Sequence, residues 1–371
     1  MVKSIEKPTF AVHKKIKLAI SILTLGMLFL SCKKEEEATS DQVVTYEDYK
    51  TLELNANIKS IKITTKKNQQ DQVEKAALKT YRIEQYFFSD NGQLTQKKVF
   101  LENGNMLEEH FYEGKDQLVK SIKYLNGKVF ETITTERNSN GELYQIKKLD
   151  AENHPKEIER YAYQNGLLSQ KTKLDGNQNE KEKITFEYSS KQLLETEKHY
   201  QKSKLILTKK YDYNEFDLLA QEFDFNAKNE LILTTKYLYN DTNELVSTAY
   251  YNSKNALVRS EKKKFDEFNQ LVSYNVLDET GQNIATEMKY NDKNQLIGYE
   301  QFENEVLTES LTHSYNLAGF LTQTEDNLNR NSSFTMIYEY ELDDKNNWIK
   351  KTTSSKNSIL EAVTREIVYY E

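Results

Sequence analysis

Tyrosines paired across one residue recur in this chain, and their rings are the side chains best suited to contact a ligand. Tyr211 and Tyr213 form one such pair, and Tyr237 and Tyr239 form the next. Aromatic rings flanked by Asn, Gln and Asp can stack on sugar rings or pack against a protein partner. The alternative is that the pairs fill the interior of the fold. We favour the interior, because the pairs have the same strand parity as the leucines near them.

The histidines and the nucleophile motifs predict no catalytic or metal-binding centre. The sequence contains no H-E-x-x-H motif, no G-x-S-x-G elbow and no phosphate-binding G-x-x-x-x-G-K-[ST] loop. The histidines that follow residue 31 lie too far apart in sequence to suggest paired metal ligands: His110, His154, His199 and His313. We therefore expect no catalytic residue, no metal ion and no cofactor.

The acidic residues suggest two weaker alternatives. Turns 240–244 and 343–347 carry oxygens that can hold calcium, but they lack the Gly and the distal Glu of an EF-hand loop, so ordinary turn chemistry is favoured. Two carboxylates placed across neighbouring strands can hydrolyse a glycoside. Because the chain has 58 Asp and Glu residues, such pairs arise by chance. A glycan-active hydrolase is therefore only the alternative.

The charge balance argues against a nucleic-acid partner. The chain has 51 basic and 58 acidic residues, and its net charge of −7 becomes −11 without residues 1–31, which hold five Lys and one Glu. Phosphate binding needs a clustered basic face, whereas the run Lys262-Lys263-Lys264 is flanked by acidic residues. The 25 Tyr and 16 Phe place the chain outside the disordered class.

The first 31 residues have the features of an export signal. Five lysines precede residue 18, an apolar run covers residues 18–30, and Ser31-Cys32 follows. The apolar run is too short to span a bilayer with its flanks. Cys32 is the only cysteine, so an intramolecular disulfide is excluded.

The residues up to Cys32 resemble the lipobox of bacterial lipoproteins, with Phe29 in the place of the usual Leu: Phe29-Leu30-Ser31-Cys32. The resemblance implies that Cys32 is acylated and begins the mature chain, which would anchor the protein to a membrane without a spanning helix. The charged run 33–37 resembles the export tag of surface lipoproteins of Bacteroidetes, and a solvated acidic tether is the alternative. We expect a signal peptide over 1–31, a flexible acidic tether over 32–50, one domain over 51–371, and an outer-membrane location exposed at the cell surface.

Short strands at regular spacing must position the side chains of the domain. An aliphatic or aromatic residue restarts the chain after a polar turn at steps of 24 to 27 residues: Leu94, Leu118, Leu143, Leu168, Leu193, Leu219, Leu245, Leu271, Leu296, Leu321 and Trp348. A second set lies between these anchors: Met106, Val129, Leu205, Leu231, Leu257, Ile284 and Val306. Each repeat therefore holds two strands and two turns. Before the array, residues 52–66 predict an opening strand, and residues 67–80 fit either a long hairpin or one helical turn.

The turns contain Gly or Asn, and both residues adopt the positive φ of tight hairpins. Gly92, Gly104, Gly127, Gly141, Gly166 and Gly281 occupy some turns, and Asn takes the place of Gly in others: Asn243, Asn255, Asn269 and Asn294. Reversals every ~12 residues make consecutive strands antiparallel, because a parallel pair needs a longer crossover. We therefore predict an all-β antiparallel meander of about 22 strands in ~25-residue, two-strand repeats.

Alternation within the strands predicts one buried and one wet face. Residues 231, 233, 235, 237 and 239 share the apolar face, and the other face is polar apart from Leu238. Open sheets seldom exceed ~10 strands without curling, so the sheet must coil, and we expect its Tyr and Leu faces to meet across an interior. A lipid-facing sheet is disfavoured, because segment 260–264 places charges on both faces.

The phrase Tyr-x-Tyr-[Asn/Asp]-x-x-[Asn/Gly]-x-Leu, as in residues 211–219 and 237–245, resembles the YD repeats of RHS-type proteins. It is also similar to the MORN-variant hairpin repeats of bacterial lipoproteins. The resemblance covers roughly residues 81–371. This chain has Asn-Glu-Leu or Asn-Gln-Leu where Gly-Arg-Leu is usual, and it lacks the length of a toxin-enclosing shell. The resemblance implies an elongated, coiled β-hairpin array and brings no catalytic residue with it.

Three functions are compatible with these features. We favour a non-enzymatic, lipid-anchored surface module that binds a protein or a glycan. The alternatives are a glycan-active hydrolase, which a pocket with two buried carboxylates of unequal pKa would support, and a structural envelope spacer, which should lack an exposed aromatic patch.

Overall fold

The fold is described from a computed structural model of the chain, for residues 54, 57–68, 78–114, 117–328, 334–356 and 358–371. These residues form β-strands joined by turns, within one compact unit, Tyr46–Glu371. None of them belongs to a helix long and apolar enough to cross a membrane. The predicted signal peptide, Cys32, the whole predicted tether and its boundary with the domain lie outside the described residues, so those remain predictions.

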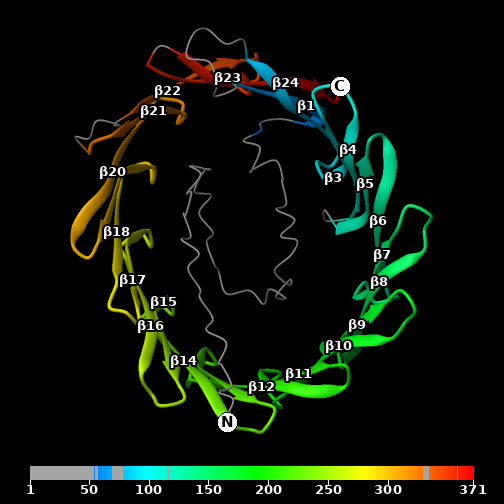
Figure 1. The fold of residues 1–371 in the computed structure, drawn as a ribbon. Helices are drawn as coiled ribbons and strands as arrows, with labels where there is room; N and C mark the ends of the chain where they lie inside the picture. The colour runs from blue at the N-terminus through cyan, green and yellow to red at the C-terminus, as the bar shows by residue number, and fades with distance from the viewer. Residues whose placement is uncertain (1–53, 55–56, 69–77, 115–116, 329–333, 357) are drawn as a thin grey trace, which may run out of the picture. The chain divides into compact units, whose positions relative to one another are not determined.

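One sheet contains 24 strands that follow each other in chain order (Figure 1). The strands are β1 Ile58–Lys67, β2 Lys79–Phe88, β3 Leu94–Phe100, β4 Met106–Glu113, β5 Gln117–Leu125, β6 Lys128–Arg137, β7 Leu143–Leu149, β8 Pro155–Gln164, β9 Leu167–Asp175, β10 Glu180–Tyr188, β11 Leu194–Gln201, β12 Lys204–Tyr213, β13 Leu219–Asn226, β14 Leu231–Tyr239, β15 Leu245–Asn252, β16 Leu257–Phe265, β17 Leu271–Asp278, β18 Asn283–Tyr290, β19 Leu296–Glu303, β20 Val306–Tyr315, β21 Leu321–Asp326, β22 Thr335–Leu342, β23 Trp348–Ser355 and β24 Ser358–Tyr369. The prediction of an all-β antiparallel meander of two-strand repeats is confirmed.

The sheet closes on itself, because β1 pairs antiparallel with both β2 and β24. In this seam Ile61 lies opposite Tyr86 on one side and Ile367 on the other. Lys62 and Glu366 add an ion pair of 2.8 Å across it. The sequence predicted coiling and left closure open; closure pairs the terminal strands, which would otherwise be the exposed edges of the sheet.

Most turns are built around the side chain of one Asn or Asp. Asn214 Oδ1 accepts the N–H groups of Phe216 and Leu218, both at 3.0 Å. Asp217 then has a φ of +60° and donates its N–H to the Asn214 carbonyl at 3.1 Å. Asn and Asp favour this turn because the short side chain replaces a backbone acceptor. The predicted positive φ is confirmed in the turns that lack Gly, at Asn243, Asn255, Asn269 and Asn294.

β-bulges accompany nearly all the turns and were not predicted from the sequence. Asp212 pairs with Gln221 whereas Tyr213 pairs with Leu219, so Ala220 has no partner in the ladder. Among the described strand pairs, a comparable register shift is missing only from β17–β18 and β21–β22. Because a bulge bends its strand and increases the twist, regularly placed bulges curve the sheet toward closure.

The core is concentrated at the seam. A buried cluster joins β1 to β2, β3 and β4 through Ile58, Ile61, Ile63, Tyr86, Phe88, Leu94 and Tyr112. Elsewhere most leucine anchors are half-buried. A ring of 24 strands spaced ~4.8 Å apart has a circumference on the order of 115 Å, and its interior is too wide for its own side chains to fill. The expectation that the Tyr and Leu faces meet across an interior is therefore wrong for the middle of the array.

The predicted alternation of exposure is present in β14. Ile232, Lys236 and Leu238 are exposed, while the residues of the other face are half-buried or buried. Thr234 departs from the pattern, since it is buried on the otherwise exposed face. Turns also alternate between the two edges of the ring. We call the edge whose turns follow even-numbered strands, and so precede the leucine anchors, the anchor edge; turns after odd-numbered strands form the opposite edge.

Candidate binding surface

The second tyrosine of each pair ties two neighbouring strands together at the anchor edge. The Tyr213 hydroxyl donates to the Leu194 carbonyl at 2.8 Å, and the Tyr239 hydroxyl donates to the Leu219 carbonyl at 3.0 Å. Three further repeats make the same hydrogen bond, between 2.8 and 3.0 Å: Tyr188 to Leu168, Tyr290 to Leu271 and Tyr315 to Leu296. We call this contact the tyrosine clasp. The accepting carbonyl lies just beyond the end of the backbone ladder between the two strands. In β13 and β14, for example, ladder pairing starts at Gln221, two residues after Leu219.

The first tyrosine of each pair donates to a glutamate on a neighbouring strand. The Tyr211 hydroxyl lies 2.9 Å from Glu197 Oε2, and the Tyr237 hydroxyl lies 3.2 Å from Glu222 Oε2. Both hydroxyls of a pair are thus engaged within the sheet. The hydroxyls of the tyrosine pairs therefore have a structural role, but their rings stay half-buried on the sheet rather than filling an interior as the sequence suggested.

These glutamates belong to a polar network on one face of β11, β12 and β13. Lys209 Nζ lies 2.6 Å from Glu222 Oε1 and 3.5 Å from Asp224 Oδ1. Lys209 is also the direct ladder partner of both Glu197 and Asp224. On the far side of Glu197, His199 Nε2 lies 2.6 Å from Glu197 Oε1. Strand register thus brings together residues that are up to 27 positions apart, a grouping that no sequence motif marks.

The two buried carboxyl groups of this network have pKa values shifted in opposite directions. Burial raises the pKa of Glu197, but the nearby His199 and the hydrogen bond from Tyr211 outweigh it, so the pKa lies below its ordinary value. Burial also raises the pKa of Asp224; the nearby Glu222 carboxylate adds to the increase, and Lys209 only partly opposes it. Burial together with Glu222 raises the pKa of the Tyr237 phenol.

Unequal carboxyl pKa values are one of the two features that would support a hydrolase, and the second feature is a pocket. The two surface depressions described below do not include Glu197, Glu222 or Asp224. Lys209 already occupies the space between Glu222 and Asp224. The network therefore resembles a structural ion-pair ladder of the kind that shifts pKa values without catalysis.

The histidines lie on four separate hairpins and form no joint centre among the described residues. His110 Nε2 is 3.2 Å from Glu108, and His313 Nδ1 is 3.0 Å from the Thr324 hydroxyl. His154 differs, because it shares an exposed turn with Asp150 and Glu152, and one ligand atom of each lies within 4.8 Å of the others. This grouping follows from the turn itself, in which Asp150 Oδ1 accepts the N–H groups of Glu152 and His154.

The two turns considered for calcium use their oxygens for turn formation. Asn240 Oδ1 accepts the N–H groups of Thr242 and Glu244, and Asn240 Nδ2 donates to Glu244 Oε2 at 2.7 Å. In turn 343–347, Asp343 Oδ1 accepts two N–H groups in the same way. The Tyr369 hydroxyl donates to Asp343 Oδ2. Ordinary turn chemistry, as favoured from the sequence, accounts for both turns.

Exposed apolar side chains stand on turns of the anchor edge. Phe216 and Phe268 occupy the same turn position two repeats apart and are 65% and 69% exposed. Leu317, on a later turn, is 97% exposed. Side chains brace neighbouring turns against one another: Lys191 pairs with Asp217 at 2.7 Å, and Gln295 donates to the Gly319 carbonyl at 3.0 Å. These rings were not predicted from the sequence, because the expected ligand contacts were tyrosines in strands. The signal for them is a Phe within a turn, at Asn-Glu-Phe216 and Asp-Glu-Phe268.

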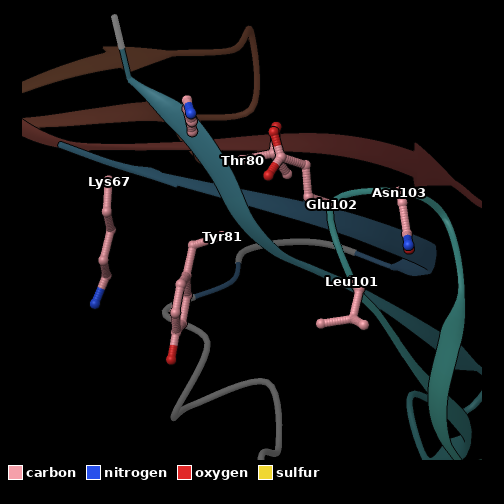
Figure 2. A pocket seen from close by; sticks show the side chains of 7 residues that line it. Lys67, Thr80, Tyr81, Leu101, Glu102 and Asn103 are labelled. Carbon is pink, nitrogen blue, oxygen red and sulfur yellow. The ribbon is translucent and has the colours of Figure 1, made fainter. Parts of the chain in front are cut away.

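Two shallow depressions lie near the edges of the sheet. Figure 2 shows the first, with the side chains of Tyr81 and Leu101 beside Lys67, Glu102 and Asn103. The second lies between the turns that contain Lys293 and Leu317. Both are open to solvent, and their lining mixes charged and apolar groups. Neither encloses a small molecule in the manner of a ligand cavity.

Comparisons with known proteins find only distant similarity to solved structures. No family model and no curated protein matches the chain. The structure of TcdB2-TccC3-TEV is similar at 13% identity and a TM-score of 0.35, over 82% of this chain and 20% of that one, so this chain spans about one fifth of its length. A porin-like protein from Bacteroides uniformis ATCC 8492 is similar at 13% identity and a TM-score of 0.24, over 84% of this chain and 98% of that one.

Proposed function

We propose that the protein is a lipid-anchored component of the cell envelope, exposed at the cell surface, whose closed sheet serves as a non-enzymatic binding module for a glycan or a protein. The observation that carries the proposal is the braced row of turns at the anchor edge with exposed Phe216 and Phe268. The resemblance of the repeats to YD and MORN-variant arrays supports a repeat scaffold, and the lipobox-like sequence at Cys32 supports the anchor.

Rigid exposed rings among amide and carboxylate groups suit recognition. A ring held on a preformed turn loses little conformational entropy on binding, and its face can stack on a sugar or enter a partner's pocket. The turn that holds Phe216 is fixed by two hydrogen bonds to Asn214 and by the Lys191–Asp217 ion pair. Glu267 precedes Phe268 in the same turn and is also exposed, so it offers a polar group for orienting a ligand.

The binding proposal is tested with glycan arrays and with pull-downs from envelope extracts. We expect the Phe216→Ala/Phe268→Ala variant to lose the captured ligand. The matched control is Tyr81→Ala/Phe130→Ala, which removes two other exposed rings located at the opposite edge. An equal loss in both variants, or full retention in the first, would refute the role of the anchor-edge rings.

The anchoring proposal is tested separately by cell fractionation. Cys32→Ala should move the protein from the membrane fraction to the soluble fraction, because it removes the predicted acyl site. Ser31→Ala keeps a small residue before Cys32 and should leave the protein in the membrane fraction. Retention of the Cys32→Ala protein in the membrane would rule out lipid anchoring at this residue.

The proposal of a non-catalytic role rests on the way the buried carboxyl groups are used. Glu197 and Asp224 face Lys209, His199 and Tyr211 rather than a ligand cavity. We expect the protein to release no sugar from a panel of envelope glycans. Release that disappears in Glu197→Gln and persists in the surface control Glu215→Gln would instead establish a hydrolase.

A further inference from the structure

Three consecutive hairpins at the opposite edge carry exposed lysines without ion-pair partners among the described residues. Lys202 and Lys204 lie at the β11–β12 turn, Lys228 at the β13–β14 turn and Lys254 at the β15–β16 turn. All four are exposed, and none takes part in a salt bridge or a side-chain hydrogen bond of the described structure. Because these three turns follow odd-numbered strands, they stand side by side along one edge (Figure 1). We call residues 202–206, 226–232 and 252–257 the lysine sector.

Few acidic groups oppose these lysines. Glu230 is the only acidic residue of the lysine sector, and Asn226 Nδ2 donates to its Oε2 at 2.8 Å. On the preceding hairpin, Glu180 Oε1 accepts the Ser203 hydroxyl at 3.1 Å and lies 3.9 Å from Lys183. The lysine sector itself therefore carries four lysines and one carboxylate, in a protein that is acidic overall. The local excess of positive charge attracts anions.

Each hairpin of the sector also exposes a large aliphatic side chain next to its lysines. Ile206 is 48% exposed, Ile232 is 43% exposed and Leu257 is 41% exposed. Ile206 and Ile232 are bulge residues without a partner in the ladder, and Leu257 directly precedes the bulge of β16. A bulge re-aims side chains at the end of a strand. The same turns thus present apolar tips and cations together.

Cations beside apolar tips fit the headgroup layer of a bilayer. Phosphate groups attract lysine at about 1 kcal/mol for each residue near the surface, and aliphatic tips enter the adjoining acyl boundary. A free anion in solution would contact only the lysines, so it would not explain the exposed aliphatic side chains, whereas a lipid surface would contact both. The next two hairpins of the same edge carry Asp278, Glu279, Glu303 and Glu305 beside Ile284 and Val306, so in this direction the sector ends at the β15–β16 turn.

We propose that the lysine sector docks the sheet onto an anionic lipid surface. This inference deepens the proposed envelope function: the acyl anchor would hold the protein at the membrane, and the sector would orient the ring with its opposite edge against the headgroups. The anchor-edge rings would then face away from the bilayer, toward a surface ligand. The docking itself needs no acyl chain, because its attraction comes from the described residues.

The test uses the chain from Lys33 to Glu371, which has no acylation site and keeps every described strand pairing, since these all lie within residues 58–371. Binding is measured by sedimentation with phosphatidylglycerol vesicles and with phosphatidylcholine vesicles. We expect binding to phosphatidylglycerol only, and we expect it to weaken with salt. Lys202→Gln/Lys204→Gln/Lys228→Gln/Lys254→Gln should weaken it by about fivefold for each lysine removed.

A matched control removes the same charge elsewhere on the ring: Lys262→Gln/Lys264→Gln/Lys289→Gln/Lys293→Gln, four exposed lysines of β16, β18 and the β18–β19 turn. It should bind like the parent chain. Ile206→Ser/Ile232→Ser/Leu257→Ser should weaken binding without changing the melting temperature. Absent binding to phosphatidylglycerol, equal binding to phosphatidylcholine, or an equal loss in the lysine control would each overturn the proposal. None of these results bears on acylation at Cys32, which the Cys32→Ala fractionation decides.

Discussion

Among the repeats from β9 to β20, the tyrosine clasp is missing from one, and this gap allows a gain-of-stability test. Tyr239 and its equivalents donate to a leucine carbonyl 19 or 20 residues earlier. At the equivalent position of the next repeat the chain has Phe265, which pairs with Leu271 as Tyr239 pairs with Leu245. We therefore predict that Phe265→Tyr places a hydroxyl at the carbonyl of Leu245 and stabilises the protein.

The expected magnitude follows from the hydrogen bond that is added or removed. A neutral intramolecular hydrogen bond contributes about 0.5–1.5 kcal/mol net. Phe265→Tyr should add about this amount to the free energy of unfolding, and Tyr239→Phe should remove about the same. The clasps lie two strands apart, about 10 Å, so their effects should add. Tyr→Phe at all five clasps should cost about 5 kcal/mol: Tyr188, Tyr213, Tyr239, Tyr290 and Tyr315.

Urea unfolding measures these changes, with far-UV circular dichroism for the sheet and the fluorescence of Trp348, the only tryptophan, for the last hairpins. Tyr144→Phe is the control, because it removes an exposed tyrosine hydroxyl that makes no hydrogen bond in the described structure. The reasoning is refuted if Phe265→Tyr lowers the unfolding midpoint, or if the five-fold Tyr→Phe variant unfolds at the same urea concentration as the parent.

Three further outcomes are expected. Burial raises the pKa of Tyr213, Tyr290 and Tyr315 above the unfolded value of about 10. Their contribution to stability is therefore complete below pH ~10 and is lost as pH rises through the folded pKa values. The urea concentration at the unfolding midpoint should decrease above pH ~10, and it should decrease less steeply in the variant in which all three tyrosines are replaced by Phe. Asn269 has a φ of +62°, so Asn269→Gly should be tolerated, whereas Asn269→Ala should lower the free energy of unfolding by about 1–2 kcal/mol. Equal urea midpoints for the two variants would contradict the turn assignment. Ile61 is 1% exposed in the seam, so Ile61→Ala should lower the free energy of unfolding by about 2–5 kcal/mol. Ile232→Ala, at an exposed site, should change the thermal midpoint little. Similar decreases in stability at both sites would show that the seam does not form the core of the fold.

The local features of the fold could be predicted from the sequence because they depend on short-range chemistry. Asn243 and Asn294 mark turns since their own backbone adopts positive φ, and the leucine spacing sets the length of each hairpin. Bulges escaped prediction because they have no residue signature: Ala220 and Glu195 both lie in one. Closure depends on the summed effect of those bulges, so it could not be derived either.

The candidate surface was harder to predict than the fold. Glu197, Lys209 and Asp224 meet only through strand register, and a slip of one residue would send alternate side chains to the other face. The lysine sector is likewise invisible as a sequence run, because Lys204, Lys228 and Lys254 are 24 and 26 residues apart. Its charges gather only because alternate turns share an edge.

The seam between β1 and β24 also constrains how such a protein can change in length. Joining the first strand to the last in antiparallel fashion demands an even number of strands. Gene duplication or loss of a whole two-strand unit preserves that parity and only widens or narrows the circle, whereas gain of a solitary strand would force a parallel closure. Evolution can therefore resize this protein in steps of about 25 residues, and natural relatives of the same architecture should differ by complete units.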